Sequence, residues 1–296
     1  MPTYKPAQGI MWGKAVLTLV GSIGVTFIPI FIRAPIIQNL IHPLTTAVFL
    51  MEALFCLLPS SYFPDSRFGS ATGGMICVLF VVVFAMLDVF LPGSKGGDDK
   101  EEEPKQADNQ EDGGEKPKGG KPSLDNVGNF TWFTAIVVGF MWITYMMVGI
   151  AEEAYYGVLW HAYKQGSAYQ PYDSINSIFV SFFHYATLQY VFGMWVMNDA
   201  PPMWLYLVYM LPIAILNPLS MIISFYCHRN PSSIATARSC FASFMAGILC
   251  YIGFRMMFQF QAYFKGESDM KNRIIQISVL AVGFLWMIFV IGIGLM

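Results

Sequence analysis

Long apolar segments recur along the chain and are separated by short polar breaks. A helix that crosses the hydrocarbon core of a bilayer needs roughly 20 mostly apolar residues, so each segment predicts a membrane-spanning helix. Prolines mark several of the breaks, such as Pro35 after the first segment and Pro201 after the fifth. The predicted spans are 11–32, 39–59, 74–92, 130–161, 174–197, 203–227, 234–264 and 273–295.

Residues 93–128 have a different composition from the rest of the chain. This segment is rich in Gly, Lys, Glu, Asp and Pro and has no large apolar residue before Leu124. Such a sequence buries too little apolar surface to offset the entropy of ordering, so we predict a disordered loop. The loop divides the chain into three spans in residues 1–92 and five in residues 129–296. A solvated linker is the simplest interpretation, and a regulatory or partner-binding loop is the alternative.

The overall composition supports a membrane protein. Hydrophobic residues make up 55% of the chain, charged residues 12%, and the mean hydropathy is +0.52. A soluble domain of about 300 residues still exposes about a quarter of its unfolded surface, which is hard to reconcile with these values. We therefore predict an all-α integral membrane protein whose first partner is the lipid bilayer.

Several function classes find no support in the sequence. The chain contains no GxSxG, HExxH or Walker sequence, so we do not expect an enzyme or a bound cofactor. No basic aromatic surface suggests binding to nucleic acid. The five cysteines form no CxxC pair, so a disulfide scaffold is not expected.

The distribution of Lys and Arg predicts an orientation, because cytoplasmic loops carry an excess of these residues. If the loop 93–128 is cytoplasmic, that side holds ten of them and the other side six, with Lys14 counted among the six. Both termini then face away from the cytoplasm. The sequence does not distinguish the plasma membrane from an organelle membrane.

A few ionisable residues lie inside the predicted spans, where each costs about 2.5–3.5 kcal/mol at mid-bilayer and is a functional candidate. Glu52 and Cys56 are four apart and share one helix face, so a carboxylate and a thiol could bind zinc there. The alternative is a hydrogen-bonded glutamate beside a cysteine that packs as a small apolar residue. The other candidates are Asp88, Glu152, Glu153, His184 and Arg255.

The other candidates also have two interpretations. Glu152 and Glu153 point about 100° apart around a helix, so we expect at least one to be structural. His184 lies deep in a span, where it either bonds a neighbouring helix or acts as a ligand with Glu152. Asp88 and Arg255 either pair across the bundle or lie near the interfaces.

The order of these features resembles the ZIP (ZRT/IRT-like) family of divalent metal transporters. The segment 15–31, with Pro29, is similar to the first helix of that family, and 45–61 is similar to its GVFL…HLLPEA stretch. The segment 211–224 is similar to FSLxxPLGIxIG, and 245–254 to AAGTFLYVAL. The resemblance implies a bundle of eight transmembrane helices in a 3+5 arrangement, separated by a variable cytoplasmic loop.

The resemblance carries over only part of the metal site of the family. In HSxxEGxxxG the glutamate falls on Glu152, but Val148 and Gly149 replace the preceding histidine and serine. In HKxxExxxxG the histidine falls on His184, but Leu188 replaces the glutamate. In HLLPE the histidine and the acid become Cys56 and Ser60. The predicted metal ligands are therefore Glu152, His184, Cys56 and Glu52.

Two functions follow from this comparison. The first is transport of a divalent, zinc-like cation, which would be the substrate of the protein rather than a resident cofactor. The second is a non-transporting ZIP-like relative that acts as a structural, sensor or assembly subunit of a membrane complex. The protein partners left open are a second copy of the chain or the other subunits of such a complex.

Overall fold

The computed structural model describes residues 4–31, 35–60, 69–90, 132–198, 201–227, 231–266 and 270–295. Nearly all of these residues are helical. The helices are α1 (Ala7–Phe31), α2 (Pro35–Met51), η1 (Glu52–Leu57), α3 (Leu58–Ser60), α4 (Gly69–Phe90), α5 (Trp132–Lys164), α6 (Asn176–Asn198), α7 (Met203–Cys227), α8 (Pro231–Gly266) and α9 (Met270–Leu295).

The second predicted span, 39–59, is one continuous helix with a wider turn inside it. The π-helical turn η1 joins α2 to α3, and Met51 and Leu58 on either side of it have ordinary α-helical backbone angles. Pro59 explains why the regular pattern cannot continue, since proline has no N–H and its ring collides with the carbonyl four residues earlier. The backbone N–H of Leu58 bonds instead to the carbonyl of Ala53.

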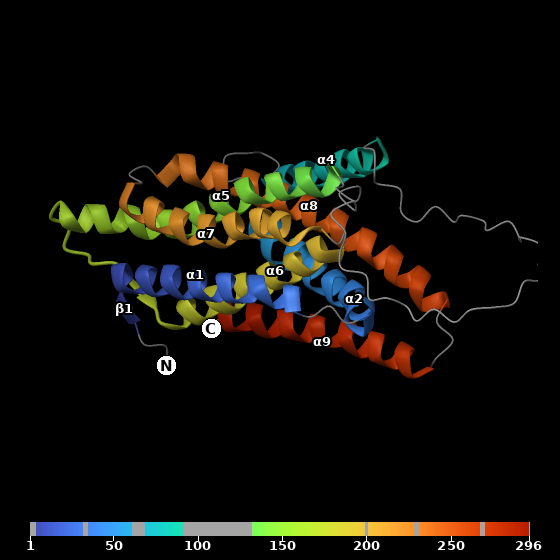
Figure 1. Ribbon diagram of the computed structural model, residues 1–296. Coiled ribbons are helices and arrows are strands. Elements are labelled where there is room, and N and C mark those ends of the chain that lie inside the picture. Colours follow the sequence, from blue (N-terminus) through green and yellow to red (C-terminus); the bar gives the residue numbers. More distant parts are fainter. Residues whose placement is uncertain are drawn as a thin grey trace, which may run out of the picture.

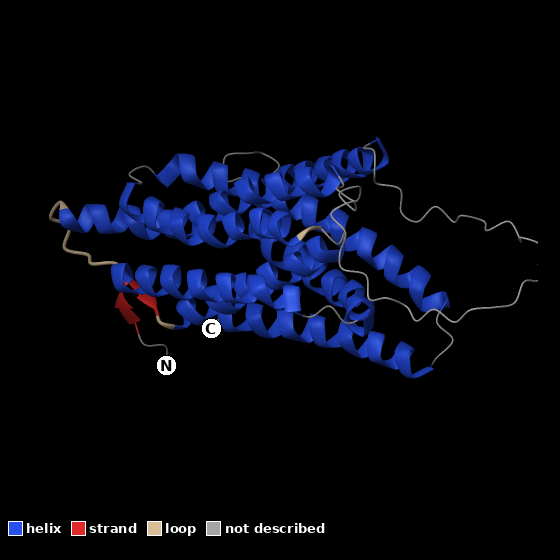
Figure 2. Cartoon of the chain, in the orientation of Figure 1, coloured by secondary structure: helices blue, strands red, loops and turns tan. Residues whose placement is uncertain are grey.

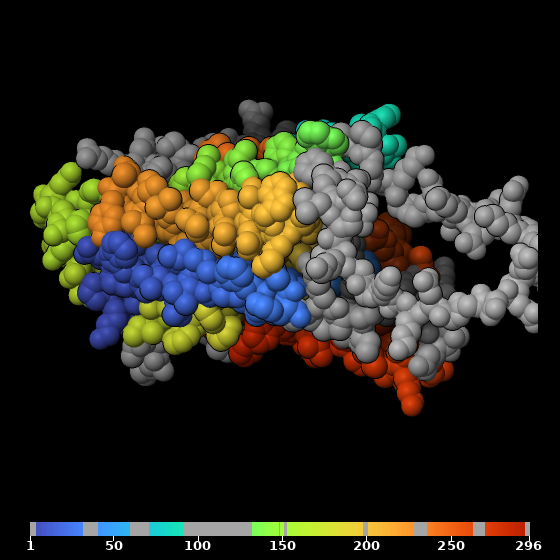
Figure 3. Space-filling model, in the orientation of Figure 1, coloured from blue at the N-terminus to red at the C-terminus, as the bar shows by residue number. Residues whose placement is uncertain are grey.

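The helices form an elongated bundle with their axes roughly along its length (Figure 1). Helix α1 packs between α6 and α7, as the face in Figure 3 shows, and α7 also lies along α5. On the other side, α4 packs on α8, and α2 contacts α8, α9 and α6. The turn η1 packs against α8 and buries Glu52, Ala53 and Leu57, whereas Leu54 and Phe55 on its other face are exposed.

Two short strands form a small sheet at one end of the bundle (Figure 2). Strand β1 (Tyr4–Pro6) pairs antiparallel with β2 (Tyr172–Ser174), and Lys5 lies opposite Asp173. The sheet ties the start of α1 to the connection between α5 and α6. The pattern of apolar segments does not predict these strands.

The exterior of the bundle is apolar, as expected for a protein in contact with lipid. Helix α4 exposes Met75, Val78 and Val89, and α9 exposes Val282 and Leu285, each by more than half of its surface. Five of the described helices, namely α1, α4, α7, α8 and α9, are long and apolar enough to span a membrane. The predicted all-α fold, with helices long and apolar enough to cross a membrane, is thus confirmed, whereas their insertion in a membrane and the eight-span 3+5 arrangement stay predictions.

Two of the remaining helices contain shorter apolar stretches, and the predicted loop is not described by the structure. The parts of α2–η1 and α5 with a membrane-like composition are shorter, at Ile41–Leu57 and Trp132–Met147. The predicted loop 93–128 lies outside the described residues, so its disorder and its cytoplasmic position stay predictions.

Candidate metal centre

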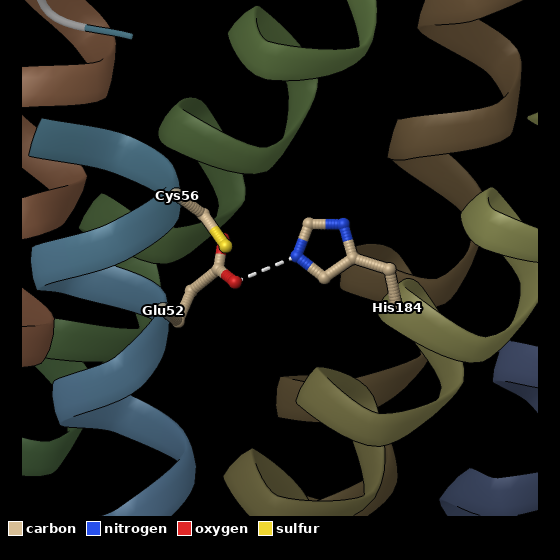
Figure 4. A group of neighbouring side chains, drawn as sticks. All are labelled: Glu52, Cys56 and His184. Atoms are coloured by element: carbon tan, nitrogen blue, oxygen red, sulfur yellow. Dashed lines mark hydrogen bonds and ion pairs between the residues drawn. The ribbon is translucent and has the colours of Figure 1, made fainter. Parts of the chain in front are cut away.

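The carboxylate of Glu52 meets the imidazole of His184 in the interior of the bundle (Figure 4). The His184 Nε2 and Glu52 Oε2 atoms are 2.7 Å apart. Glu52 is 1% exposed and the His184 side chain 19%. A carboxylate buried this deeply is stable only when it is paired, so this contact accounts for how the chain tolerates Glu52.

The thiol of Cys56 lies beside the Glu52 carboxylate (Figure 4). Both residues belong to the π-helical turn η1, whereas His184 comes from α6. One ligand atom from each of Glu52, Cys56 and His184 can be chosen so that all three lie within 4.8 Å of one another. Turns of π-helix inside α-helices are frequent at functional sites, which agrees with the position of η1.

The spacing of the three groups is close to what a zinc ion requires. Zinc binds nitrogen, sulfur and carboxylate oxygen at about 2.0–2.3 Å, so tetrahedral ligands are about 3.3–3.8 Å apart. The present 2.7 Å between His184 and Glu52 is a hydrogen bond, and an ion would replace that proton and separate the two atoms slightly. Tyr185 is buried beside the imidazole, with 5.2 Å between the ring centroids, and the buried Tyr145 packs against Tyr185.

The remaining positions compared with the metal site of the family are only partly described by the structure. Glu152 lies on α5, but its side chain is outside the described residues, as is that of Val148. Leu188 is buried in the apolar core. Gly149 faces Asn217 and Ser220 of α7, where a β-carbon would collide with both residues. The prediction for Glu152 therefore stays untested.

Glu153 has a structural partner that the predicted spans do not indicate. Its carboxylate binds the ammonium group of Lys14 at 3.0 Å, and Lys14 also binds Asp173 at 2.8 Å. The orientation count places Lys14 among loop residues, which is wrong because Lys14 lies inside α1 and is 6% exposed. The sequence does contain a pattern that indicates a buried polar face on this helix. Polar residues recur every four positions on one face of α1, at Lys14, Thr18, Ser22 and Thr26.

Asp88 and Arg255 pair across the bundle, as one of the two interpretations predicted. Arg255 Nε lies 3.3 Å from Asp88 Oδ2, and the Tyr251 hydroxyl donates to the same carboxylate oxygen. The Arg255 guanidinium also lies over the ring of Phe133. These contacts join α4, α5 and α8 and account for both charges structurally.

No model of a known protein family matches this chain, and no curated protein matches its sequence. The resemblance to ZIP transporters therefore remains an interpretation of sequence patterns.

Proposed function

We propose that the protein transports a divalent, zinc-like metal cation across a membrane, in the manner of a ZIP-like carrier. The observation that carries the proposal is the cluster of Glu52, Cys56 and His184 inside a bundle of apolar helices. Ionisable groups are expensive in a membrane interior, and where they occur they commonly mark an ion path.

The three donor types favour a particular class of ion. A thiolate and an imidazole are ligands for zinc and softer metals, whereas magnesium and calcium prefer oxygen ligands alone. Three protein ligands leave a fourth position of the tetrahedron for water or for Glu152. Such an open site suits an ion that must leave again.

The eight-span arrangement is part of the same proposal. The predicted ranges each overlap a helix of the structure or, for 39–59, the continuous run of α2, η1 and α3. Under this proposal the bundle places the candidate metal centre between two groups of helices, with α2 and η1 on one side and α6 on the other. Movement of one group against the other would expose the site to each side in turn.

Flux into liposomes that contain a zinc-sensitive dye tests the proposal. The informative variant is Cys56→Ser combined with His184→Gln, because both new side chains keep hydrogen-bonding groups for Glu52 but bind zinc poorly. We expect zinc flux in the wild type and only the flux of protein-free liposomes in this variant. The matched control is Cys240→Ser with His161→Gln, the same two changes at residues outside the cluster.

Two outcomes would contradict the proposal, the first for the cluster and the second for transport. Equal flux in the wild type and in the double variant would show that the cluster does not carry the ion. Zinc binding by the wild type without any flux would instead support the non-transporting alternative, a sensor or assembly subunit that keeps the site. Equilibrium dialysis of the purified protein against zinc separates these two outcomes.

A further inference from the structure

Helices α4 and α8 touch at their backbones near Gly247. A β-carbon at Gly247 would lie 2.7 Å from the carbonyl oxygen of Cys77 and 2.6 Å from the β-carbon of Phe80. These distances leave no room for a side chain, so α4 lies directly against the backbone of α8 at this level. Small residues allow such close contact between helices in membranes.

Two cysteine thiols meet beside this contact. Cys250 follows Gly247 by three residues, so the two residues share one face of α8. The thiols of Cys77 and Cys250 are hydrogen-bonded to each other. Both cysteines are free, and the residues are 6% and 3% exposed. Residues from opposite sides of the segment 93–128 thus bring their sulfur atoms together.

This arrangement is the one from which a disulfide forms. A disulfide needs two cysteines whose Cα atoms are about 4.4–6.8 Å apart and whose sulfur atoms can approach to about 2.05 Å. The backbone contact at Gly247 and the thiol hydrogen bond one turn away hold the two positions against each other. A cysteine that packs only as a small apolar residue has no need of a second cysteine opposite it.

A bond at this position would join two helices with different surroundings. Helix α4 is the least buried of the five long apolar helices and packs mainly on α8, at the edge of the bundle in Figure 1. Helix α8 also packs on η1, which carries Glu52 and Cys56. A bond between Cys77 and Cys250 would therefore fix the peripheral helix α4 to the helix that lies behind the candidate metal centre.

We propose that Cys77 and Cys250 are a redox-active dithiol, which hydrogen peroxide oxidises to a disulfide between α4 and α8. The sulfur of one thiol loses its proton and attacks a peroxide oxygen, which breaks the O–O bond and yields a sulfenic acid and one water. The sulfur of the other thiol then attacks the sulfenic sulfur and displaces a second water. Two thiols are thus oxidised by two electrons, and one peroxide is reduced to two waters.

The burial of the pair decides which oxidant fits. Peroxide is small and uncharged, so it can enter an apolar interior that excludes a protein disulfide or glutathione. The same burial would protect the finished disulfide from reduction by large thiols, since exchange requires access to a sulfur atom. The pair lies apart from Glu52 and His184, and its oxidation does not depend on the proposed transport function.

Cleavage between the two cysteines gives a direct readout of the bond. A protease recognition sequence inserted within 93–128 leaves Cys56 and Cys77 on one fragment and Cys227, Cys240 and Cys250 on the other. The purified protein is treated with peroxide, its remaining thiols are blocked with N-ethylmaleimide, and the chain is cleaved. We expect the two fragments to run as one species on a non-reducing gel and to separate after dithiothreitol is added.

Variants assign the bond to the proposed pair. Cys77→Ala and Cys250→Ala should each lose the linked species, because both keep a small apolar side chain at the contact but remove one sulfur. Cys240→Ala is the matched control, since it makes the same change on the same helix and fragment, about 15 Å away along α8. It should link as the wild type does.

A further measurement covers the case in which these variants do not fold. Peptide mass spectrometry of the oxidised wild type should find one peptide with Cys77 joined to one with Cys250, lighter by two hydrogen atoms than the separate pair. The Cys56→Ser, His184→Gln protein should give the same product, even if nothing is transported.

Three results would overturn the proposal. The first is a wild type whose fragments stay separate after treatment with peroxide. The second is a linked species that survives Cys250→Ala, and the third is a linked peptide pair that contains another cysteine. Each of these results leaves the proposed transport function untouched, because the measurement involves no zinc.

Discussion

At the scale of single residues, Glu52 depends on the groups that would share a metal ion with it. Its carboxylate is almost fully buried and bonds His184, while the Cys56 thiol lies against it. If the proposed metal site is correct, this arrangement is its metal-free form, in which a hydrogen bond joins two ligand atoms. Under the proposed function, metal binding would release protons from these same groups.

This dependence makes Glu52→Gln a sharp test of metal binding. The amide can still hydrogen-bond to His184, so we expect thermal stability close to that of the wild type. It lacks the negative charge that zinc requires, so zinc should no longer raise the melting temperature. In the wild type, zinc at 100 times its Kd should add about 2.7 kcal/mol to the free energy of unfolding.

Asp88→Asn is the matched control for this measurement, because it makes the same chemical change in the Asp88–Arg255 pair. Asp88→Asn should lower the melting temperature of the zinc-free protein, but zinc should still raise the melting temperature of this variant. Equal stabilisation by zinc in Glu52→Gln and in the wild type would remove Glu52 from the ligand set.

The site residues could be predicted from the sequence only in part. The sequence points to Glu52, Cys56 and His184 because they are polar side chains within apolar segments. Placing an ionisable side chain in a membrane costs free energy whatever the fold is, so such residues stand out in the sequence alone. That these three residues share one site was suggested through the resemblance and not by the apolar pattern, because their contact depends on how α2 and α6 rotate about their axes. Lys14 was missed because a lysine near the start of a span commonly reaches the interface, whereas here two carboxylates hold it inside.

At the scale of elements, the helices follow from the apolar segments, but two local features do not. The π-helical turn η1 keeps the same apolar pattern as an α-helix, and Pro59 indicates only that the regular ladder is broken nearby. The strands β1 and β2 are three residues each and exist only because the two segments pair across the fold. Isolated short strands have no stability of their own, so no local signal predicts them.

Helices α5 and α7 approach closely at Gly157, which yields a test of their packing. A β-carbon at Gly157 would lie 2.6 Å from the carbonyl oxygen and 2.9 Å from the Cα atom of Phe225. Small residues allow such close backbone contact between helices in membranes. Gly157→Ala must therefore push α5 away from α7, and we expect a loss of about 1–3 kcal/mol, as for other overpacked sites.

Gly139→Ala on the same helix is the control for Gly157→Ala. A β-carbon there meets nothing within 4 Å, so alanine should be neutral or slightly stabilising through its higher helix propensity. Thermal unfolding of both variants in the same detergent makes the comparison. A Gly157→Ala protein as stable as Gly139→Ala would mean that α5 and α7 are farther apart than described here.

At the scale of the whole molecule, the contacts define two ends of the bundle. The sheet places the start of α1 beside the segment that follows α5, and the two termini lie near this end (Figure 1). The Asp88–Arg255 pair and the ring of Phe133 bring the end of α4 and the start of α5 together. Since α5 has 33 residues, about 50 Å of helix separates the two ends.

This separation predicts the membrane topology. If the long axis of the bundle crosses the bilayer, the termini lie on one side and residues 93–128 on the other, as an even number of spans requires. Epitope tags at each terminus and within 93–128 can be tested by protease protection in sealed vesicles of known orientation. We expect the two terminal tags to behave alike and the loop tag to behave oppositely, with all three cleaved after detergent is added.

Whether the two termini lie on the same side or on opposite sides of the membrane also tests whether every helix crosses it. Termini on opposite sides would require an odd number of spans, so at least one of the helices would lie along the membrane instead of crossing it. The best candidates would be those outside the five long apolar helices, which are α2 with η1, α5 and α6. These helices carry Glu52, Cys56 and His184, so a path across the bilayer through the candidate metal centre depends on their crossing it.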